Sequence, residues 1–412
     1  MTTLERLVGI AEQYADLAFL GRGGVLRVPL PDGPVSTLRL ELPTDEPLRL
    51  QSIGLTPEPH MPPAIAVNEW NAWHGERFSG ARLLDFDNPS GVVLHTRVGA
   101  GGSWAELRFA EPTDVRELAL RNVDNENARC DSGLRVLADG VLVYDGAARE
   151  AELTAALITC AEGTSLEPLA VVLADTMAAD YEKARKTFDG LDLEPDVGTQ
   201  FRALVSQRVL AARELQWTIH GPMRSFSFWS EQEKRDYIAH TMRVLEDLRA
   251  LTPNVCLGFG SVLAVVRDHE PIPHDDDLDI IIGFEPDQAP TLTAATRLVG
   301  EHLRALGYQV SGRYVAHRHV TKDGMPNVDV FSGIFEGDTI AWYPGRRGSL
   351  TRSMMFPPSS ASLLDVPVLL PHEPEQYLEQ VYGPSWRVPD PGFQHTWDAG
   401  ANYQDLVEQP PA

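Results

Sequence analysis

The densest group of side chains able to do chemistry lies between residues 275 and 279. Asp275, Asp277 and Asp279 are spaced two apart at the start of an apolar run that ends at Phe284. Alternate residues of a strand point to one face, so these three carboxylates are expected to lie side by side. Like charges this close repel one another and lose hydration, and a divalent ion that prefers hard oxygen ligands, Mg²⁺ or Mn²⁺, relieves both costs. Asp276 faces the other way and is the least suitable ligand.

A calcium loop of the EF-hand type does not fit this spacing. With Asp275 as its first residue, the loop would need Gly at its sixth position and Glu at its twelfth. The chain has Ile280 and Pro286 there. These residues alone also allow an alternative to the metal site, in which they form an acidic turn before a core strand and bind no ligand.

A glycine-rich turn stands upstream of the aspartates. Gly258, Gly260 and Ser261 follow a short apolar run and precede a predicted helical turn over 261–267. Backbone N–H groups at such a turn can approach a phosphate. A Gly-Ser turn followed by a strand with Asp-x-Asp resembles the nucleotidyltransferase superfamily, in which two aspartates hold metal and a third comes from a neighbouring strand. Asp329, near the start of the apolar run NVDVF, is the expected third.

The elements that must position these residues alternate between helices and strands. Ser230 and Glu233 form a capping box, which predicts a helix reaching about residue 250. Strands are expected over 254–260 and 278–284, a helix over 291–306, and further strands within 309–320 and 327–335. Helices and strands in alternation favour an α/β domain.

The segment from residue 260 to 280 resembles the LicD/fukutin-related phosphotransferase motif. The matching residues are Gly260, Ser261, Leu263, Arg267, Ile272, Pro273, Asp275, Asp276, Asp277 and Asp279. NVDVF resembles a later strand of that family, and residues 365–391 resemble its closing segment. The closing match is carried by Val366, Pro367, Tyr377, Leu378, Tyr382, Gly383, Trp386 and Pro389.

Two positions depart from the family pattern. His274 stands where the family commonly has Trp, and Ala264 where it has Gly. Neither change removes a ligand, so both bear on the shape of the substrate pocket more than on the mechanism. The resemblance covers about residues 230–395 and leaves the N-terminal half of the chain aside.

The resemblance implies transfer of a phospho-alcohol group, of phosphocholine or phospho-alditol type. The group moves from a CDP-activated donor to a hydroxyl of a glycan, polyol or cell-surface polymer, and CMP leaves. Metal would be held by Asp275, Asp277, Asp279 and Asp329, the last three being the catalytic set. Two alternatives remain open: a nucleotidyltransferase acting on a small acceptor, and a glycan-binding protein without activity.

Basic and imidazole side chains supply candidates for phosphate and substrate contacts. Gly260, Ser261 and Arg267 are the expected donor phosphate contacts, with a salt bridge to the acidic loop as the alternative for Arg267. Further candidates are His274, Arg313, Arg318, Lys322 and Arg352, most of them expected to be surface charges. His317 and His319 could form a metal pair, which is disfavoured because no third soft ligand is nearby.

The N-terminal half has a different sequence pattern, in which short runs of alternating apolar and polar residues are separated by turns. Leu38, Leu40 and Leu42 predict one buried strand face, and Asp139-Gly140 and Asp145-Gly146 are turn signals. Residues 103–140 resemble discoidin-like or galactose-binding-like jelly rolls. That resemblance implies glycan binding with Trp70 and Trp73 as stacking platforms, and the alternative is that both tryptophans fill a core or an interface.

The predicted fold class is α+β and multidomain. Its parts are an N-terminal helix over 1–23, a β-sandwich of jelly-roll type over 24–150, a helical connector over 151–224, and a nucleotidyltransferase-like α/β domain over 225–412. The length of 412 residues suits two or three domains.

Composition limits the binding partners and the cellular location that can be expected for the protein. With 35 basic and 59 acidic side chains, the formal charge of −24 disfavours nucleic-acid binding through a basic surface. No apolar run is long enough for a membrane span, and the first residues do not read as a secretory signal. Three scattered cysteines argue against a disulfide framework, so a cytoplasmic location is predicted.

Overall fold

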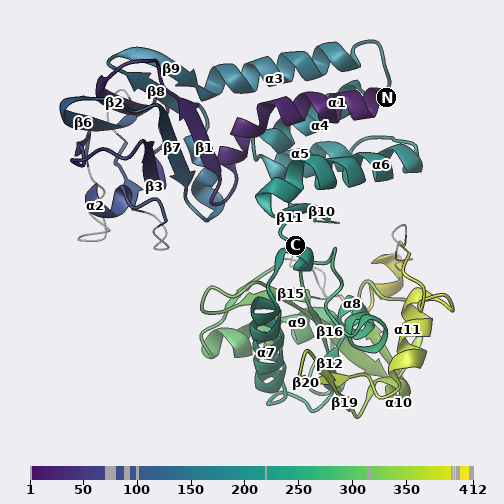
Figure 1. Ribbon diagram of the computed structural model, residues 1–412. Helices are drawn as coiled ribbons and strands as arrows, with labels where there is room; N and C mark the ends of the chain where they lie inside the picture. Colours follow the sequence, from purple (N-terminus) through teal and green to yellow (C-terminus); the bar gives the residue numbers. More distant parts are fainter. Residues whose placement is uncertain are drawn as a thin grey trace, which may run out of the picture. The chain divides into compact units, whose positions relative to one another are not determined.

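The computed structural model describes residues 2–69, 80–87, 93–98, 102–218, 220–312, 317–390, 393, 395 and 400–407. The chain divides into two compact units, unit 1 (Met1–Met223) and unit 2 (Arg224–Ala412) (Figure 1). The division falls beside residue 225, where the predicted catalytic domain begins. Within the described part of the chain, no helix is both long and apolar enough to cross a membrane.

Unit 1 contains two antiparallel sheets that contribute to one hydrophobic core. The first has the order β1 (Val25–Pro29), β7 (Glu117–Asn122), β3 (Arg49–Thr56), β5 (Leu94–His95). The second has the order β4 (Ala64–Val67), β6 (Ser103–Thr113), β2 (Val35–Leu42), β8 (Arg135–Ala138), β9 (Val141–Asp145). Leu38, Leu40 and Leu42 of β2 are all fully buried, which confirms the predicted strand face. The jelly-roll connection of the strands remains a prediction.

The two Asp-Gly pairs have different roles. Asp139 and Gly140 join β8 to β9 with φ angles of 45° and 81°, a conformation that tight hairpin turns require and that Asp and Gly tolerate. Asp145 instead caps a helix, because its side chain accepts a hydrogen bond of 3.1 Å from the backbone N–H of Ala148. The first turn prediction is therefore confirmed, whereas the second pair marks a strand-to-helix junction.

The helices of unit 1 pack into the same core as its sheets. They are α1 (Thr3–Ala11), α2 (Gly80–Leu83), α3 (Gly146–Ala161), α4 (Glu167–Met177), α5 (Tyr181–Asp189) and α6 (Pro195–Val205), with a short hairpin of β10 (Gln216–Thr218) and β11 (Gly221–Met223). Leu153 of α3 and Leu173 of α4 are fully buried in the cluster that also holds Leu40. The segment predicted as a connector is thus an integral layer of unit 1.

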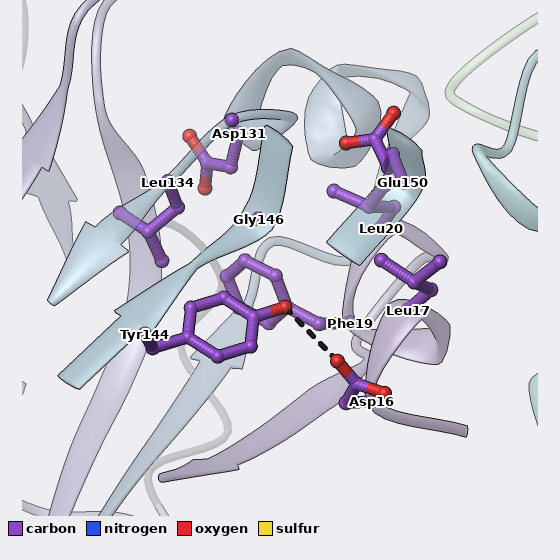
Figure 2. Close-up of a pocket in the computed structure, with 10 residues that line it drawn as sticks. Asp16, Leu17, Phe19, Leu20, Asp131, Leu134, Tyr144, Gly146 and Glu150 are labelled. Carbon is purple, nitrogen blue, oxygen red and sulfur yellow. Dashed lines mark hydrogen bonds between the residues drawn. The ribbon is translucent and has the colours of Figure 1, made fainter. Parts of the chain in front are cut away.

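A single carboxylate links the N-terminal segment to the sheet and to α3 (Figure 2). Asp16 lies in the 3-10 segment Glu12–Leu20, after α1. Its Oδ2 accepts a hydrogen bond of 3.3 Å from the Tyr144 hydroxyl of β9, and it forms an ion pair of 3.0 Å with Arg149 of α3. A cavity of about 10 Å³ adjoins these groups, room for one water molecule at most.

Unit 2 is built on one mixed sheet. Its strand order is β12 (Val255–Leu257), β13 (Asp279–Phe284), β16 (Val328–Glu336), β15 (His317–Thr321), β14 (Gln309–Ser311), and β17 (Thr339–Trp342) joins β16 to β18 (Leu350–Thr351). Strands β13 and β16 run parallel, and β12 and β15 pair with them antiparallel. The central strands are apolar because they are buried on both faces.

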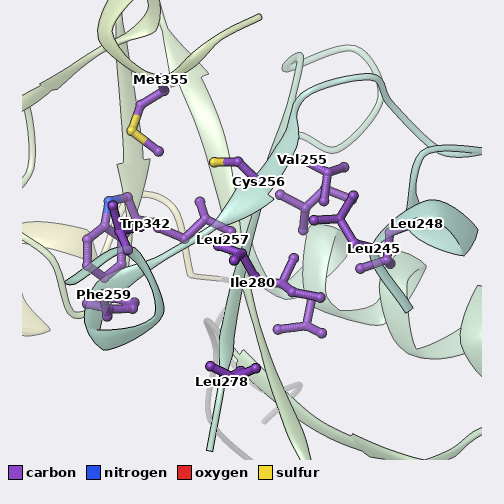
Figure 3. Close-up of a cluster of buried hydrophobic side chains, with 14 of the residues drawn as sticks. Leu245, Leu248, Val255, Cys256, Leu257, Phe259, Leu278, Ile280, Trp342 and Met355 are labelled. Carbon is purple, nitrogen blue, oxygen red and sulfur yellow. The ribbon is translucent and has the colours of Figure 1, made fainter. Parts of the chain in front are cut away.

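Two long helices pack on this sheet, α7 (Glu231–Leu248) and α9 (Leu292–Ala305). The predicted capping box is present, since Ser230 accepts from the Glu233 N–H and Glu233 accepts from the Ser230 N–H. Figure 3 shows Leu245 and Leu248 of α7 beside Val255 and Ile280 of the sheet. The remaining elements are α8 (Phe259–Leu263), α10 (Arg352–Met355), the hairpin β19 (Ser359–Leu363) and β20 (Val366–Leu370), and α11 (Pro374–Tyr382).

Candidate metal centre

Two aspartates meet across neighbouring parallel strands. Asp279 begins β13, Asp329 is the second residue of β16, and the two are direct register partners. The Asp329 N–H donates to the Leu278 carbonyl at 3.1 Å, which fixes that register. Asp277 precedes β13, and one carboxylate oxygen from each of the three aspartates lies within 4.8 Å of the others. The prediction that Asp329 joins the Asp-x-Asp pair therefore agrees with the geometry.

The electrostatics of this group are unfavourable without a counter-charge. Burial, and then repulsion from the neighbouring aspartates, raise the pKa of both Asp277 and Asp279 well above the ordinary value. Asp329 is only 8% exposed. Three carboxylates in so small a space offer hard oxygen donors suited to Mg²⁺ or Mn²⁺, and an ion would remove the repulsion. The residues present therefore fit a divalent cation.

Asp275 is not one of the three aspartates whose carboxylate oxygens lie within 4.8 Å of one another, but its charge helps to raise the pKa of Asp277 and Asp279. The prediction that Asp275, Asp277 and Asp279 share one strand face is wrong, because β13 begins only at Asp279 and the preceding residues are irregular. The Asp275 carbonyl accepts a 2.9 Å hydrogen bond from the Phe226 N–H, which shapes the irregular segment. Its carboxylate faces Gly260 instead, where an added Cβ would lie 2.8 Å from Oδ2. Burial, followed by the charge of Asp276, raises the pKa of Asp275 to about 7.

The glycine-rich turn holds Asp279 in place through its backbone. The Gly258 N–H donates to the Asp279 carbonyl at 2.9 Å, and the Ser261 hydroxyl accepts from the Asp279 N–H at 2.7 Å. Ser261 is 1% exposed, so its side chain positions the aspartate, and the contact of this turn with a donor phosphate through backbone N–H groups stays a prediction. Phe259 has a φ of 43°, and its N–H donates to the Tyr377 hydroxyl at 2.8 Å.

Tyr237 of α7 is a positioning residue that the sequence analysis missed. Its buried hydroxyl accepts a hydrogen bond of 3.0 Å from the Leu278 N–H and donates to the Asn327 carbonyl. Leu278 immediately precedes Asp279, and Asn327 lies two residues before Asp329. The Tyr237 hydroxyl therefore connects the two segments that lead into the aspartate-bearing strands β13 and β16. The only sequence signal was an aromatic residue on the buried face of a helix, which is ordinary for a core position.

Arg267 adopts the salt bridge that was the alternative to phosphate binding. Its guanidinium makes two hydrogen bonds of 2.8 Å to the Asp268 carboxylate and one of 3.2 Å to the Trp386 carbonyl. His274 lies near enough to Arg267 for the positive charge to reinforce burial, and both lower the pKa of His274. Arg267 thus connects the helical turn Ala264–Asp268 to the closing segment of the chain.

The other predicted contacts are distributed widely. Arg318 donates to the Gly312 carbonyl at 3.2 Å, and Lys322 donates to the Leu306 carbonyl at 2.8 Å. Arg313 in unit 2, and Trp70 and Trp73 in unit 1, lie outside the described residues, so glycan binding by unit 1 stays a prediction.

Arg352 is placed at the wrong end of the sheet for the predicted role. It pairs with Glu285, just beyond the far end of β13, and its guanidinium stacks over the Phe335 ring at 4.1 Å. Six residues of strand separate Asp279 from Glu285, a distance of roughly 20 Å. The prediction that Arg352 contacts the substrate is therefore wrong for a substrate bound at the aspartates.

Replacing Arg352 by Ala is expected to leave the Michaelis constant for the donor within about twofold of wild type. The reason is that a residue roughly 20 Å from the aspartates cannot touch the donor diphosphate. Steady-state kinetics of the Arg352→Ala variant measure this directly. An increase of tenfold or more would place Arg352 in the substrate site and contradict the assignment of the site to the opposite end of β13.

Two histidines adjoin the third aspartate. His319 of β15 is the register partner of Asp329, and its Nδ1 lies 2.6 Å from Asp329 Oδ1. His317 is two residues away on the same strand, and one ring nitrogen of each histidine lies within 4.8 Å of an Asp329 oxygen. The fold thus places a third potential ligand beside this pair, although it is the hard carboxylate of Asp329 and not a soft ligand.

Comparison with known proteins identifies one domain. Residues 254–373 match the family model of the LicD/FKTN/FKRP nucleotidyltransferase domain. The match includes Asp275, Asp277, Asp279, Asp329 and the Gly-Ser turn, and it indicates a transferase of phosphotransferase type. Tyr237 and Tyr377, the two tyrosines that position the site, lie outside the matched segment. No curated protein sequence matches the chain.

Proposed function

We propose that unit 2 is a metal-dependent phosphotransferase that moves a phospho-alcohol group from a CDP-activated donor to a hydroxyl of a glycan or polyol. The observation that carries the proposal is the register pairing of Asp279 with Asp329, with Asp277 within 4.8 Å of both. The LicD/FKTN/FKRP domain match supports the reaction class. Such a site fits an anionic diphosphate only with a cation present, because the chain carries a formal charge of −24.

In the proposed reaction the acceptor oxygen forms a bond to the phosphorus that carries the alcohol. The bond from that phosphorus to the bridging oxygen of the diphosphate breaks, CMP leaves with the bridging oxygen, and the acceptor proton passes to a base. Asp277, Asp279 and Asp329 would hold the cation, which stabilises charge on the attacking and leaving oxygens. Tyr237 bridges Leu278 and Asn327, and Ser261 holds the backbone of Asp279, so the carboxylates are preorganised.

The test is a screen of CDP-, UDP- and GDP-activated compounds with the full chain, Mg²⁺ and a polyol or glycan acceptor. The proposal expects CMP and a new phosphodiester in equal amounts from a CDP-activated compound, with less turnover from the UDP and GDP compounds. Pyrophosphate release from a nucleoside triphosphate, without CMP from any CDP compound, would favour nucleotidyl transfer and overturn the proposal.

Mg²⁺ is expected to raise the unfolding temperature of unit 2, and by more at pH 8 than at pH 5. In the metal-free fold, burial and mutual repulsion raise the pKa of Asp277 and Asp279, which favours their protonated forms. A raised folded-state pKa contributes stability at low pH that is lost as the pH rises through that pKa. Bound Mg²⁺ stabilises the ionised forms and offsets the loss.

Differential scanning calorimetry of the chelator-treated chain, with and without Mg²⁺, measures this difference. The Asp277→Asn variant is the control and should show a much smaller increment at pH 8. Equal increments for wild type at the two pH values would show that these carboxylates are not the groups that Mg²⁺ neutralises.

A further inference from the structure

A row of polar side chains crosses three strands of the sheet in unit 2. Asp279 of β13 pairs with Asp329 of β16, and Asp329 pairs in turn with His319 of β15. His317 is two residues from His319 and therefore shares its face of β15. Asp329 lies between an oxygen-rich group on one side and an imidazole pair on the other, and it is within 4.8 Å of the ligand atoms of both groups.

We propose that His317, His319 and Asp329 form a second cation site, suited to a transition ion of Zn²⁺ or Co²⁺ type, which shares Asp329 with the three-aspartate site. Two imidazole nitrogens and one carboxylate form a ligand set that borderline transition ions prefer and that Mg²⁺ does not. A carboxylate has two oxygens, so Asp329 can serve both sites at once.

Packing contacts fix the positions of the His317 and His319 rings beside Asp329. The His317 ring packs against Phe331 with centroids 4.9 Å apart, and the rings of His317 and His319 lie 5.0 Å apart at an interplanar angle of 76°. Gly312 permits close packing beside His319, because a Cβ there would lie 3.3 Å from the ring carbon Cδ2. Side chains ordered in this way lose little freedom when an ion binds.

The site is also accessible and able to accept the ion. The His319 side chain is 34% exposed, whereas the Asp329 side chain is 12% exposed, so solvent reaches the imidazole side of the pair. His319 Nδ1 lies 2.6 Å from Asp329 Oδ1, so an ion bound by these two atoms would move them apart, replace the hydrogen between them and release it as a proton. Three protein ligands leave further positions open for water or a substrate oxygen.

This placement suggests which substrate the second ion serves, a step that rests on the proposed function. An ion held by nitrogen ligands beside the three-aspartate site would lower the pKa of a bound hydroxyl, and the acceptor hydroxyl is the group that must lose a proton. The binding site itself does not depend on that reaction. Its existence is testable by metal binding alone.

The experiment is a titration of the chelator-treated full chain with Co²⁺, followed by visible absorption in the presence of excess Mg²⁺. We expect one Co²⁺ per chain with ligand-field bands of a nitrogen-coordinated ion. His317→Ala and His319→Ala should each weaken binding by at least about tenfold. His372→Ala is the matched control and should bind Co²⁺ as wild type does, since His372 is an exposed histidine of unit 2 whose Nδ1 lies 3.0 Å from the Pro357 carbonyl.

Two further variants make the outcome decisive. His319→Gln keeps an N–H donor for Asp329 and removes the imidazole, so it should lose Co²⁺ binding as His319→Ala does; wild-type binding by His319→Gln would overturn the proposal. Asp277→Asn removes a ligand of the three-aspartate site only, and it should keep the Co²⁺ spectrum even if transfer is lost. Failure of the proposed transfer with an intact Co²⁺ spectrum therefore refutes the function and leaves this site standing.

Discussion

Replacing Asp279 by Asn is expected to lower kcat for transfer by about a thousandfold or more. Asn has nearly the same shape, so the hydrogen bonds of its backbone to Gly258 and Ser261 can persist. The charge that holds the cation is lost, and metal stabilisation of a transferring phosphoryl group is worth several kcal/mol, or about 4 kcal/mol for a thousandfold change. Steady-state turnover at saturating Mg²⁺ and donor measures the effect.

The control for this substitution is Asp287→Asn. Asp287 is an exposed aspartate beyond the far end of β13, so the same chemical change should leave kcat unchanged. Asp277→Asn should behave like Asp279→Asn, because both carboxylates belong to the group within 4.8 Å. A folded Asp279→Asn variant with wild-type turnover would show that the reaction does not take place at this site.

Replacing Tyr237 by Phe is expected to destabilise unit 2 by about 2–4 kcal/mol and to lower kcat by about 10- to 100-fold. Phe keeps the ring but leaves the buried Leu278 N–H and Asn327 carbonyl without the hydroxyl, and each such loss costs about 1–3 kcal/mol. Both groups lie within two residues of an aspartate of the proposed metal site, so small shifts there misplace the carboxylates. Urea unfolding and steady-state kinetics give the two quantities.

Tyr144→Phe is the matched control in unit 1. It removes a half-buried hydroxyl that donates to Asp16, and both residues belong to unit 1 (Figure 2). We expect it to reduce the stability of unit 1 and to leave kcat unchanged. If Tyr237→Phe were destabilising but fully active, Tyr237 would be a core residue without a part in positioning the aspartates.

The elements around the site could be predicted because their signals are local. The capping box at Ser230 predicted the start of α7, and the apolar run after Asp279 predicted β13. Asp329 could be assigned as the third aspartate because it opens a second apolar strand. What the sequence could not provide was the parallel register that makes Asp279 and Asp329 partners, since register depends on contacts between segments about fifty residues apart.

The errors in the predicted site share a physical cause. Alternation was extended to Asp275, but the strand begins only at Asp279, and the segment before it follows hydrogen bonds to the turn at Phe226. The Ser261 hydroxyl likewise has a role that the sequence did not indicate, because it accepts a hydrogen bond from the backbone N–H of Asp279, 18 residues further along the chain. Tertiary hydrogen bonds of this kind leave no periodic trace in a sequence.

The contacts of the basic residues were the least predictable feature of the site. Every Arg carries the same charge, and the partner that it finds depends on the fold. Arg267 pairs with its neighbour Asp268, and Arg352 pairs with Glu285 at the opposite end of β13 from the aspartates. In a chain with 59 acidic and 35 basic side chains, most basic residues have an acidic partner within reach, so spacing alone does not select those that meet a phosphate.

The central claim is that Asp277, Asp279 and Asp329 form a divalent cation centre. Calorimetric titration of Mg²⁺ into the chelator-treated chain, with CDP present, tests it most directly. We predict saturable binding of Mg²⁺ to wild type and to Asp287→Asn, and at least about tenfold weaker binding to Asp279→Asn. Binding of equal affinity by wild type and Asp279→Asn, or no binding by wild type, would contradict it.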